Sequence, residues 1–207
     1  MSVSILMAFW AVSFLFVITP GMDWAYAISA GINGKMVLPA VGGMLIGHLI
    51  ATIIIAAGVG VLIADIPFAM MLLTLVGACY LLWLGFGLVR HPVTPVKELT
   101  DTPHNSVHWM IKGIGISGLN PKVFLLFLAL LPQFFDPKSL WPMSVQMLIL
   151  GTIHIMSCGI IYLFVGYGSQ VVLKTKPDAA KVVSQLSGIA MMCIAILLLV
   201  EPLIQHH

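Results

Sequence analysis

The chain has 207 residues, of which 60% are hydrophobic and 8% charged, with a formal net charge of +2 at pH 7 and a mean hydropathy of +1.11. Soluble domains carry about a quarter of charged residues, so this composition excludes an ordinary soluble domain and predicts an all-α integral membrane protein in contact with a lipid bilayer. Because the basic residues form no cluster, nucleic-acid binding is not expected.

Six apolar segments reach the ~20 residues that a helix needs to cross the hydrocarbon core. They are approximately Val3–Gly31, Met36–Ala64, Pro67–Val89, Ile111–Phe135, Pro142–Val172 and Val182–Leu203. Since they leave no stretch for a soluble domain, residues 1–207 are predicted to form a single membrane domain with six transmembrane helices.

The first segment is interrupted at Thr19, Pro20 and Gly21. Its apolar start lacks the positively charged region of a signal peptide, so we expect a membrane helix that is retained. A proline removes a backbone donor, and the freed backbone groups need partners from the protein or from a wet cavity, because lipid supplies none. Thr19, Pro20 and Gly21 are therefore candidate residues of a binding site.

Asp23 follows this break and is the strongest candidate for a functional residue in the chain. A carboxylate inside a membrane segment costs a few kcal/mol unless it faces a cavity or a partner, and intramembrane acids are functional candidates by default. The alternative is a structural role, in which Asp23 caps the helix that restarts at Trp24.

The second and fifth segments each contain one histidine, His48 and His154. Either could relay a proton near neutral pH, although a histidine on an apolar helix is more often a packing residue. Gly43 and Gly47 form a face of small residues on which another helix can approach closely. Such glycine-rich faces are compatible with a homodimer.

The three cysteines all lie within apolar segments and form no C-x-x-C pair. We expect Cys79, Cys158 and Cys193 to be small packing residues, so the sequence predicts no disulfide framework, no metal site and no cofactor.

Residues 91–110 are polar and rich in proline, which predicts an exposed cytoplasmic linker. With six crossings, this linker would share one side of the membrane with the connections near Lys35 and Lys174. That side holds seven basic residues, and the opposite side holds Lys138. The positive-inside rule then places both termini outside the cytoplasm.

The fourth segment is interrupted at Asn120, Pro121 and Lys122. Because the residue before a proline avoids the helical region, the Asn120 amide and carbonyl are expected to be free for other bonds. Lys122 lies near the middle of the segment, where it can pair with Asp23 or hold an anionic group of a substrate. The sequence does not separate these two roles.

Three crossings in each half predict two inverted repeats, residues 1–90 and 111–207, with proline-broken first and fourth helices. Paired broken helices of this kind indicate the binding site of a secondary transporter, near the middle of the membrane and between the repeats.

Four stretches of the sequence jointly resemble the LysE/RhtB family of amino-acid exporters. These stretches are residues 18–23, residues 77–85 with Arg90, residues 119–122 and residues 131–137. Met22 departs from the pattern, since the family often has a second proline there. The resemblance implies export of amino acids or close derivatives from the bacterial cytoplasm across the inner membrane, driven by the proton gradient, and it implies that the chain is not an enzyme.

Two rival functions are considered beside this one. A related exporter could carry another small solute or a metal ion, although Asp23 alone offers few oxygen ligands to a hard cation. The sequence Gly115-Ile116-Ser117-Gly118 matches the G-x-S-G of rhomboid intramembrane proteases, with His154 as the base. This rival is the least favoured, because His154 lies on the fifth segment and not on the sixth.

Overall fold

The computed structural model describes residues 1–32, 36–65, 69–91, 105–175 and, within 181–200, all but residues 183–184, 187, 190, 194 and 198. Every element in this part of the chain is helical, which confirms the all-α class. The elements are α1 (Val3–Val17), α2 (Met22–Ile32), α3 (Val37–Asp65), α4 (Ala69–Arg90), α5 (Ser106–Gly118), α6 (Pro121–Leu130), the 3₁₀ helix η1 (Leu131–Phe134) and α7 (Met143–Thr175). The described residues within 181–200 are also helical. Most of the predicted linker, residues 92–104, and the predicted helix end at Leu203 lie outside the described residues.

Two helical stretches are long and apolar enough to cross a membrane, Val37–Gly58 of α3 and Met143–Ser169 of α7. Two further spans result if each broken helix is counted as one span. In the first, α1 and α2 meet at an angle of 63°, and in the second, Ser106–Gly118 and Lys122–Phe134 meet at 52°. The described part of the chain therefore contains two to four of the six predicted spans, and both predicted breaks are sharp bends.

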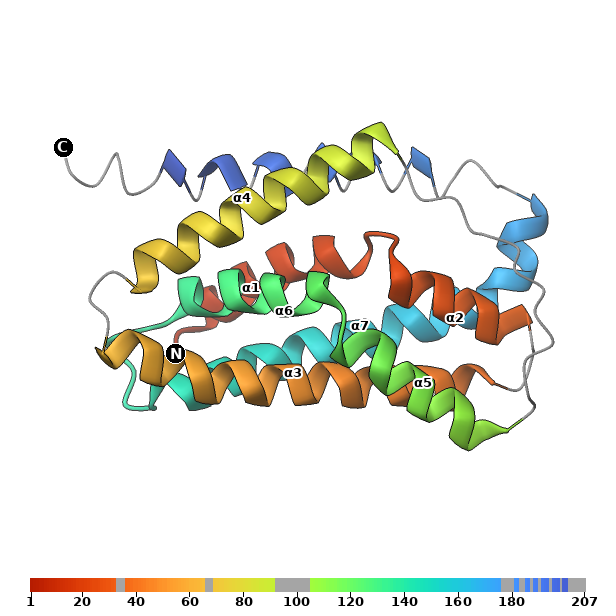
Figure 1. Ribbon diagram of the computed structural model, residues 1–207, viewed down its shortest axis with the longest axis horizontal. Helices are drawn as coiled ribbons and strands as arrows, with labels where there is room; N and C mark the ends of the chain where they lie inside the picture. Colours follow the sequence, from red (N-terminus) through yellow and green to blue (C-terminus); the bar gives the residue numbers. More distant parts are fainter. Residues whose placement is uncertain are drawn as a thin grey trace.

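The two long helices, α3 and α7, pack against each other along the molecule, and the broken helices lie over them (Figure 1). The half-helices α1 and α6 cover one end, while α2 and α5 cover the other. Each end has its own hydrophobic cluster, the first around Phe9 and Phe127 and the second around Met44 and Trp109. Both breaks therefore lie where one apolar cluster gives way to the next.

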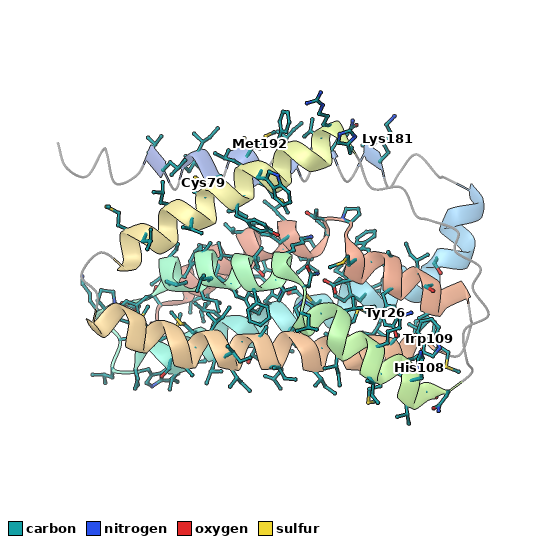
Figure 2. All side chains as sticks on the ribbon, viewed as in Figure 1. Tyr26, Cys79, His108, Trp109, Lys181 and Met192 are labelled. Atoms are coloured by element: carbon teal, nitrogen blue, oxygen red, sulfur yellow. The ribbon has the colours of Figure 1, made fainter. Side chains whose placement is uncertain are left out.

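Aromatic contacts close both ends of the bundle. At one end the rings of Phe9 on α1 and Phe134 on η1 meet edge to face, with centroids 5.4 Å apart. At the other end Tyr26 on α2 stacks on Trp109 of α5 at 5.1 Å, and its hydroxyl donates to the Trp109 carbonyl at 2.6 Å (Figure 2). Each contact joins a half of the first broken helix to a half of the second.

Glycines bring α3 and α5 into backbone contact, as predicted for the face formed by Gly43 and Gly47. A Cβ on Gly47 would lie 2.6 Å from the Gly118 nitrogen, and a Cβ on Gly43 would overlap the Met110 carbonyl. From the α5 side, a Cβ on Gly113 would lie 2.6 Å from the Ala40 carbonyl. Small residues at these positions let the two backbones touch, which is how membrane helices gain packing energy without a hydrophobic driving force.

Adjacent glycines on α3 test this contact. Gly43→Ala forces a methyl group into the α5 backbone and should destabilise the protein by about 1–3 kcal/mol, the usual cost of overpacking. Gly42→Ala is the matched control, because a Cβ there meets nothing within 4 Å. Thermal unfolding in detergent, followed by the loss of monodisperse protein, should show a lower midpoint for Gly43→Ala alone. Equal midpoints for the two variants would contradict this packing.

Candidate functional site at the two helix breaks

The first break is held by side chains that bind the carbonyls left free at the end of α1. Because α1 ends at Val17, its last carbonyls lack helical donors, and Pro20, which has no backbone N–H, cannot bind the Phe16 carbonyl. The Thr19 hydroxyl donates to the Leu15 carbonyl at 2.6 Å, and the Trp24 indole N–H donates to the Val17 carbonyl at 2.9 Å. The chain thus supplies the partners that a lipid environment lacks.

Lys122, from the second break, binds two more of these carbonyls. Its Nζ donates to the Thr19 carbonyl at 3.3 Å and lies 3.5 Å from the Phe16 carbonyl. The ammonium group therefore lies at the C-terminal end of α1, where the helix dipole favours a positive charge. Gly21 lies beside the lysine, since a Cβ on Gly21 would be 3.5 Å from Nζ.

Asp23 is buried, with 6% of its surface exposed, and it accepts three hydrogen bonds. Ser117 Oγ donates to its Oδ1 at 2.6 Å, while Asn120 Nδ2 and Tyr162 Oη donate to its Oδ2 at 3.4 and 3.3 Å. Asp23 is the second residue of α2, within the first turn, so it is not the N-cap of a helix that restarts at Trp24. Its carboxylate is held by α5, α7 and the second break.

Asn120 is the N-cap of α6, and Pro121 is the first residue of that helix. The Asn120 Oδ1 accepts the Lys122 N–H at 3.0 Å, which turns the amide NH₂ toward Asp23. The prediction of a free Asn120 carbonyl is wrong, because this oxygen accepts the N–H groups of Val123 at 3.0 Å and Phe124 at 3.2 Å. An N-cap carbonyl regularly starts the hydrogen-bond ladder of its helix.

The acid and the base of the two breaks share a cavity without binding each other. Among the described residues, no ion pair within 4.0 Å joins Asp23 to Lys122. The cavity has a volume of ≈ 10 Å³, which is close to the space that one water molecule requires. Its lining consists of Phe16, Asp23, His48, Lys122, Val123, Leu126, His154 and Tyr162.

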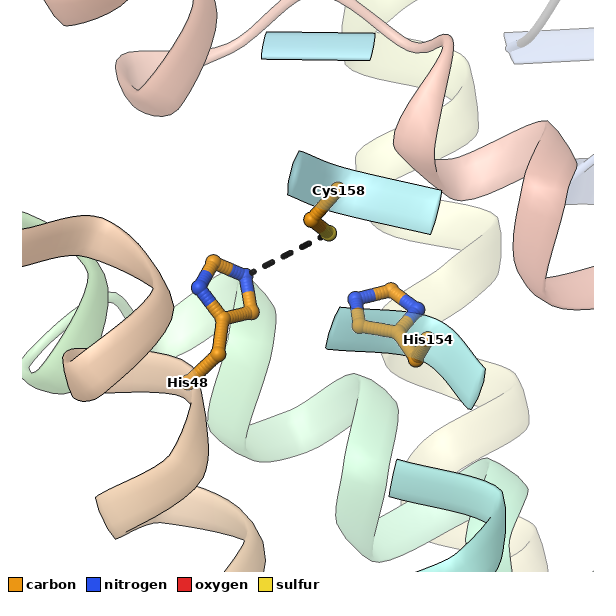
Figure 3. A group of neighbouring side chains, drawn as sticks. All are labelled: His48, His154 and Cys158. Atoms are coloured by element: carbon orange, nitrogen blue, oxygen red, sulfur yellow. Dashed lines mark hydrogen bonds between the residues drawn. The ribbon is translucent and has the colours of Figure 1, made fainter. Parts of the chain in front are cut away.

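The two histidines lie side by side on this cavity, with ring centroids 5.6 Å apart. His48 Nδ1 lies 2.9 Å from the Met44 carbonyl, and His154 Nδ1 lies 2.7 Å from the Ser13 hydroxyl. Cys158 approaches them as well, with Sγ 3.9 Å from His48 Nε2 (Figure 3). The prediction of a simple packing role for Cys158 overlooked this cluster, because the sequence does not show that α3 and α7 face each other here.

Two partners of Asp23 were not identified from the sequence: Ser117, which donates to Oδ1, and Tyr162, which donates to Oδ2 and also lines the cavity. The sequence pattern indicates Ser117 only as a protease nucleophile, yet its hydroxyl donates to Asp23, and His154 binds Ser13 instead. This geometry contradicts a dyad of Ser117 and His154. One signal pointed to Ser117, since it lies one helical turn before Asn120 and so on the same side of the second break.

Residues 14–202 match the family described as LysE type translocator. The chain belongs to this family. A leucine efflux protein of Klebsiella pneumoniae is 26% identical over 178 residues, which cover 84% of each chain. A cysteine/O-acetylserine efflux protein of Salmonella paratyphi A is 28% identical over 155 residues, or 72% of this chain and 76% of its own. An uncharacterized membrane protein of Vibrio cholerae is 30% identical over 154 residues, or 73% and 74%. No solved structure matches the chain significantly.

Membership of the LysE type translocators confirms the resemblance carried by the sequence motifs. Translocators are transporters, so the chain is not an enzyme and the protease alternative is wrong. In this translocator, the motifs that contain Pro20 and Pro121 contact each other through two hydrogen bonds. Asn120 donates to Asp23, and Lys122 donates to the Thr19 carbonyl.

Paired serine variants test the hydrogen bonds to Asp23. Ser117→Ala removes a 2.6 Å bond to a buried carboxylate and should cost about 1.5–3 kcal/mol of stability, as bonds to charged groups do. Ser157→Ala is the control, since that buried hydroxyl donates to the Ile153 carbonyl one turn earlier in its own helix. Thermal unfolding should rank Ser117→Ala as the less stable variant.

A double-mutant cycle separates the Ser117 bond from general packing. In an Asp23→Asn background, Ser117→Ala should cost clearly less than in the wild type, because the charged acceptor is gone. Additive losses would show that the 2.6 Å contact contributes nothing specific.

Proposed function

We propose that this translocator is a secondary active exporter that moves amino acids or close derivatives out of the cytoplasm. Family membership supports a transporter, and relatives at 26–28% identity are named as leucine and cysteine/O-acetylserine efflux proteins. The observation that carries the proposal is the meeting of the two helix breaks, which brings an acid and a base to one cavity in the middle of the bundle.

Asp23 and Lys122 suit the two charges of an amino acid. The cargo ammonium would bind the Asp23 carboxylate, replacing one of its weaker donors, Asn120 or Tyr162, at 3.4 and 3.3 Å. The cargo carboxylate would bind the Lys122 ammonium, whose present partners are neutral carbonyls at 3.3 and 3.5 Å. A bond between two opposite charges is stronger than either of these contacts.

Cargo binding requires the helices to separate, because a cavity of ≈ 10 Å³ is too small for any amino acid. Under alternating access, the contact of Phe9 with Phe134 would open toward one side of the membrane and the contact of Tyr26 with Trp109 toward the other. The order of a bent pair, a long helix and a further helical segment occurs twice along the chain, which supports two inverted three-helix repeats.

Asp23 is the proposed coupling residue. In this mechanism it takes up a proton as the cargo ammonium leaves, so that the empty site does not hold an unbalanced buried charge. The inward flow of protons would then drive export. A relay through His48 and His154 stays a prediction from the sequence, and so does a homodimer.

The proposed location is the bacterial cytoplasmic membrane, with six spans and both termini outside the cytoplasm. The support is the apolar length of α3 and α7, the two bent pairs, and the distribution of lysine and arginine along the sequence. The relatives named as efflux proteins come from bacteria.

Efflux from proteoliposomes tests the coupling role of Asp23. With radiolabelled leucine inside and an imposed pH gradient, Asp23→Asn should lower gradient-driven efflux at least tenfold, because an amide neither binds the ammonium ionically nor exchanges a proton. Asp136→Asn is the matched control, since Asp136 lies in the loop after η1 and outside the cavity. Full gradient-driven efflux by Asp23→Asn would refute the assignment.

A panel of candidate amino-acid substrates tests whether the protein is an amino-acid exporter. Cells that overproduce the protein and are preloaded with leucine, cysteine, O-acetylserine or lysine should export at least one amino acid faster than cells that produce Lys122→Met. Overproduction should not raise tolerance to manganese or cobalt salts. Metal tolerance without amino-acid efflux would favour the alternative of a metal exporter.

A further inference from the structure

We propose that His48, His154 and Cys158 form a binding site for a soft or borderline transition-metal cation such as Zn²⁺ or Cd²⁺. The sequence predicted no metal site, since the cysteines form no C-x-x-C pair and His48 is far from His154 and Cys158 along the chain. The fold brings them together, with His48 on α3 and the other two residues on α7 (Figure 3).

The spacing of the three residues suits a tetrahedral ion. Their ligand atoms all lie within 4.8 Å of one another, and Cys158 Sγ is 3.9 Å from His48 Nε2. Metal–ligand bonds of about 2.0–2.3 Å place tetrahedral N and S ligands roughly 3.3–3.6 Å apart. The cluster therefore needs to contract by no more than about 1.5 Å, which rotations of the three side chains can supply.

Both imidazole rings are already oriented for metal binding. His48 Nδ1 donates to the Met44 carbonyl at 2.9 Å, so the lone pair of Nε2 faces Cys158. His154 Nδ1 is bound to Ser13 at 2.7 Å, which leaves Nε2 to face the cluster (Figure 3). Histidines that bind metals usually hold their second nitrogen in this way, because the outer bond fixes both the tautomer and the ring.

The donor set selects the class of ion. Two neutral imidazoles and one thiolate suit Zn²⁺, Cd²⁺ or Cu⁺ and suit Mg²⁺ or Ca²⁺ poorly. Binding replaces the proton of the Cys158 thiol by the metal, and that proton is released to the buffer. The adjoining cavity of ≈ 10 Å³ can hold a water molecule as the fourth ligand.

The charges around the cavity allow such an ion. Asp23 and Lys122 line the same cavity as the two histidines and contribute opposite charges. The Cys158 thiolate offsets one of the two charges of a divalent cation, so the occupied cluster carries one net positive charge. An ion at this position would tie α3 to α7 beside the transport site, so it should also inhibit a transporter whose helices have to separate.

Cadmium binding to the purified protein in detergent tests the site directly. We expect one Cd²⁺ per chain, with the ultraviolet charge-transfer absorption that marks a cadmium–thiolate bond. Cys158→Ser should abolish the absorption. The double variant Cys79→Ser and Cys193→Ser should retain it in full, because neither of these exposed cysteines belongs to the cluster. Binding that survives Cys158→Ser, or that disappears in the double variant, would overturn the proposal.

Histidine variants decide the case if Cys158→Ser does not fold. His48→Gln and His154→Gln keep the thiol and should each weaken Cd²⁺ binding at least tenfold, as the loss of even an outer contact to a metal ligand commonly does. Unchanged affinity in both variants would show that Cd²⁺ binds a cysteine alone. The measurement uses no transport assay, so its result is independent of the cargo and of proton coupling.

Discussion

The structure depends on one constraint: backbone groups freed by a broken helix inside a membrane must find partners within the protein. The first break frees carbonyls at the end of α1, and Thr19, Trp24 and Lys122 bind them. The second break is stabilised by the Asn120 side chain, which caps α6. Because Lys122 and Asn120 belong to the second break, each interruption is stabilised in part by the other.

In the proposed transport mechanism, this arrangement suits a zwitterionic cargo. Asp23 accepts three hydrogen bonds and Lys122 binds two carbonyls, yet neither charge neutralises the other within 4.0 Å in the part of the chain that the structure describes. In that mechanism, the ammonium and the carboxylate of the cargo would each replace a neutral partner, at Asp23 and at Lys122 respectively. Backbone contacts between α3 and α5 fix this half of the second broken helix against a long helix.

Sequence patterns located the helices well, since apolar runs end where charged or turn residues begin. The predicted segments Met36–Ala64 and Pro67–Val89 agree closely with α3 and α4. Both prolines marked true bends, because a missing N–H is a local property.

The partners of Asp23 were not predictable in the same way: Ser117 and Tyr162 reach it only through the packing of α5 and α7, and pairing between helices leaves no local pattern. The N-cap role of Asn120 was not predicted, although asparagine before a first-turn proline is a common helix start.

The most direct test of the account is the distance between the two breaks. Solid-state NMR on the protein in lipid bilayers can measure the dipolar coupling between the ¹³Cγ of Asp23 and the ¹⁵Nδ2 of Asn120. The account predicts a coupling that corresponds to hydrogen-bond contact, consistent with the 3.4 Å between the nitrogen and Oδ2 of the carboxylate, and that is lost in Asn120→Ala. An absent coupling would show that the two breaks do not meet and would contradict the proposed transport site, whereas a coupling that persists in Asn120→Ala would come from another nitrogen.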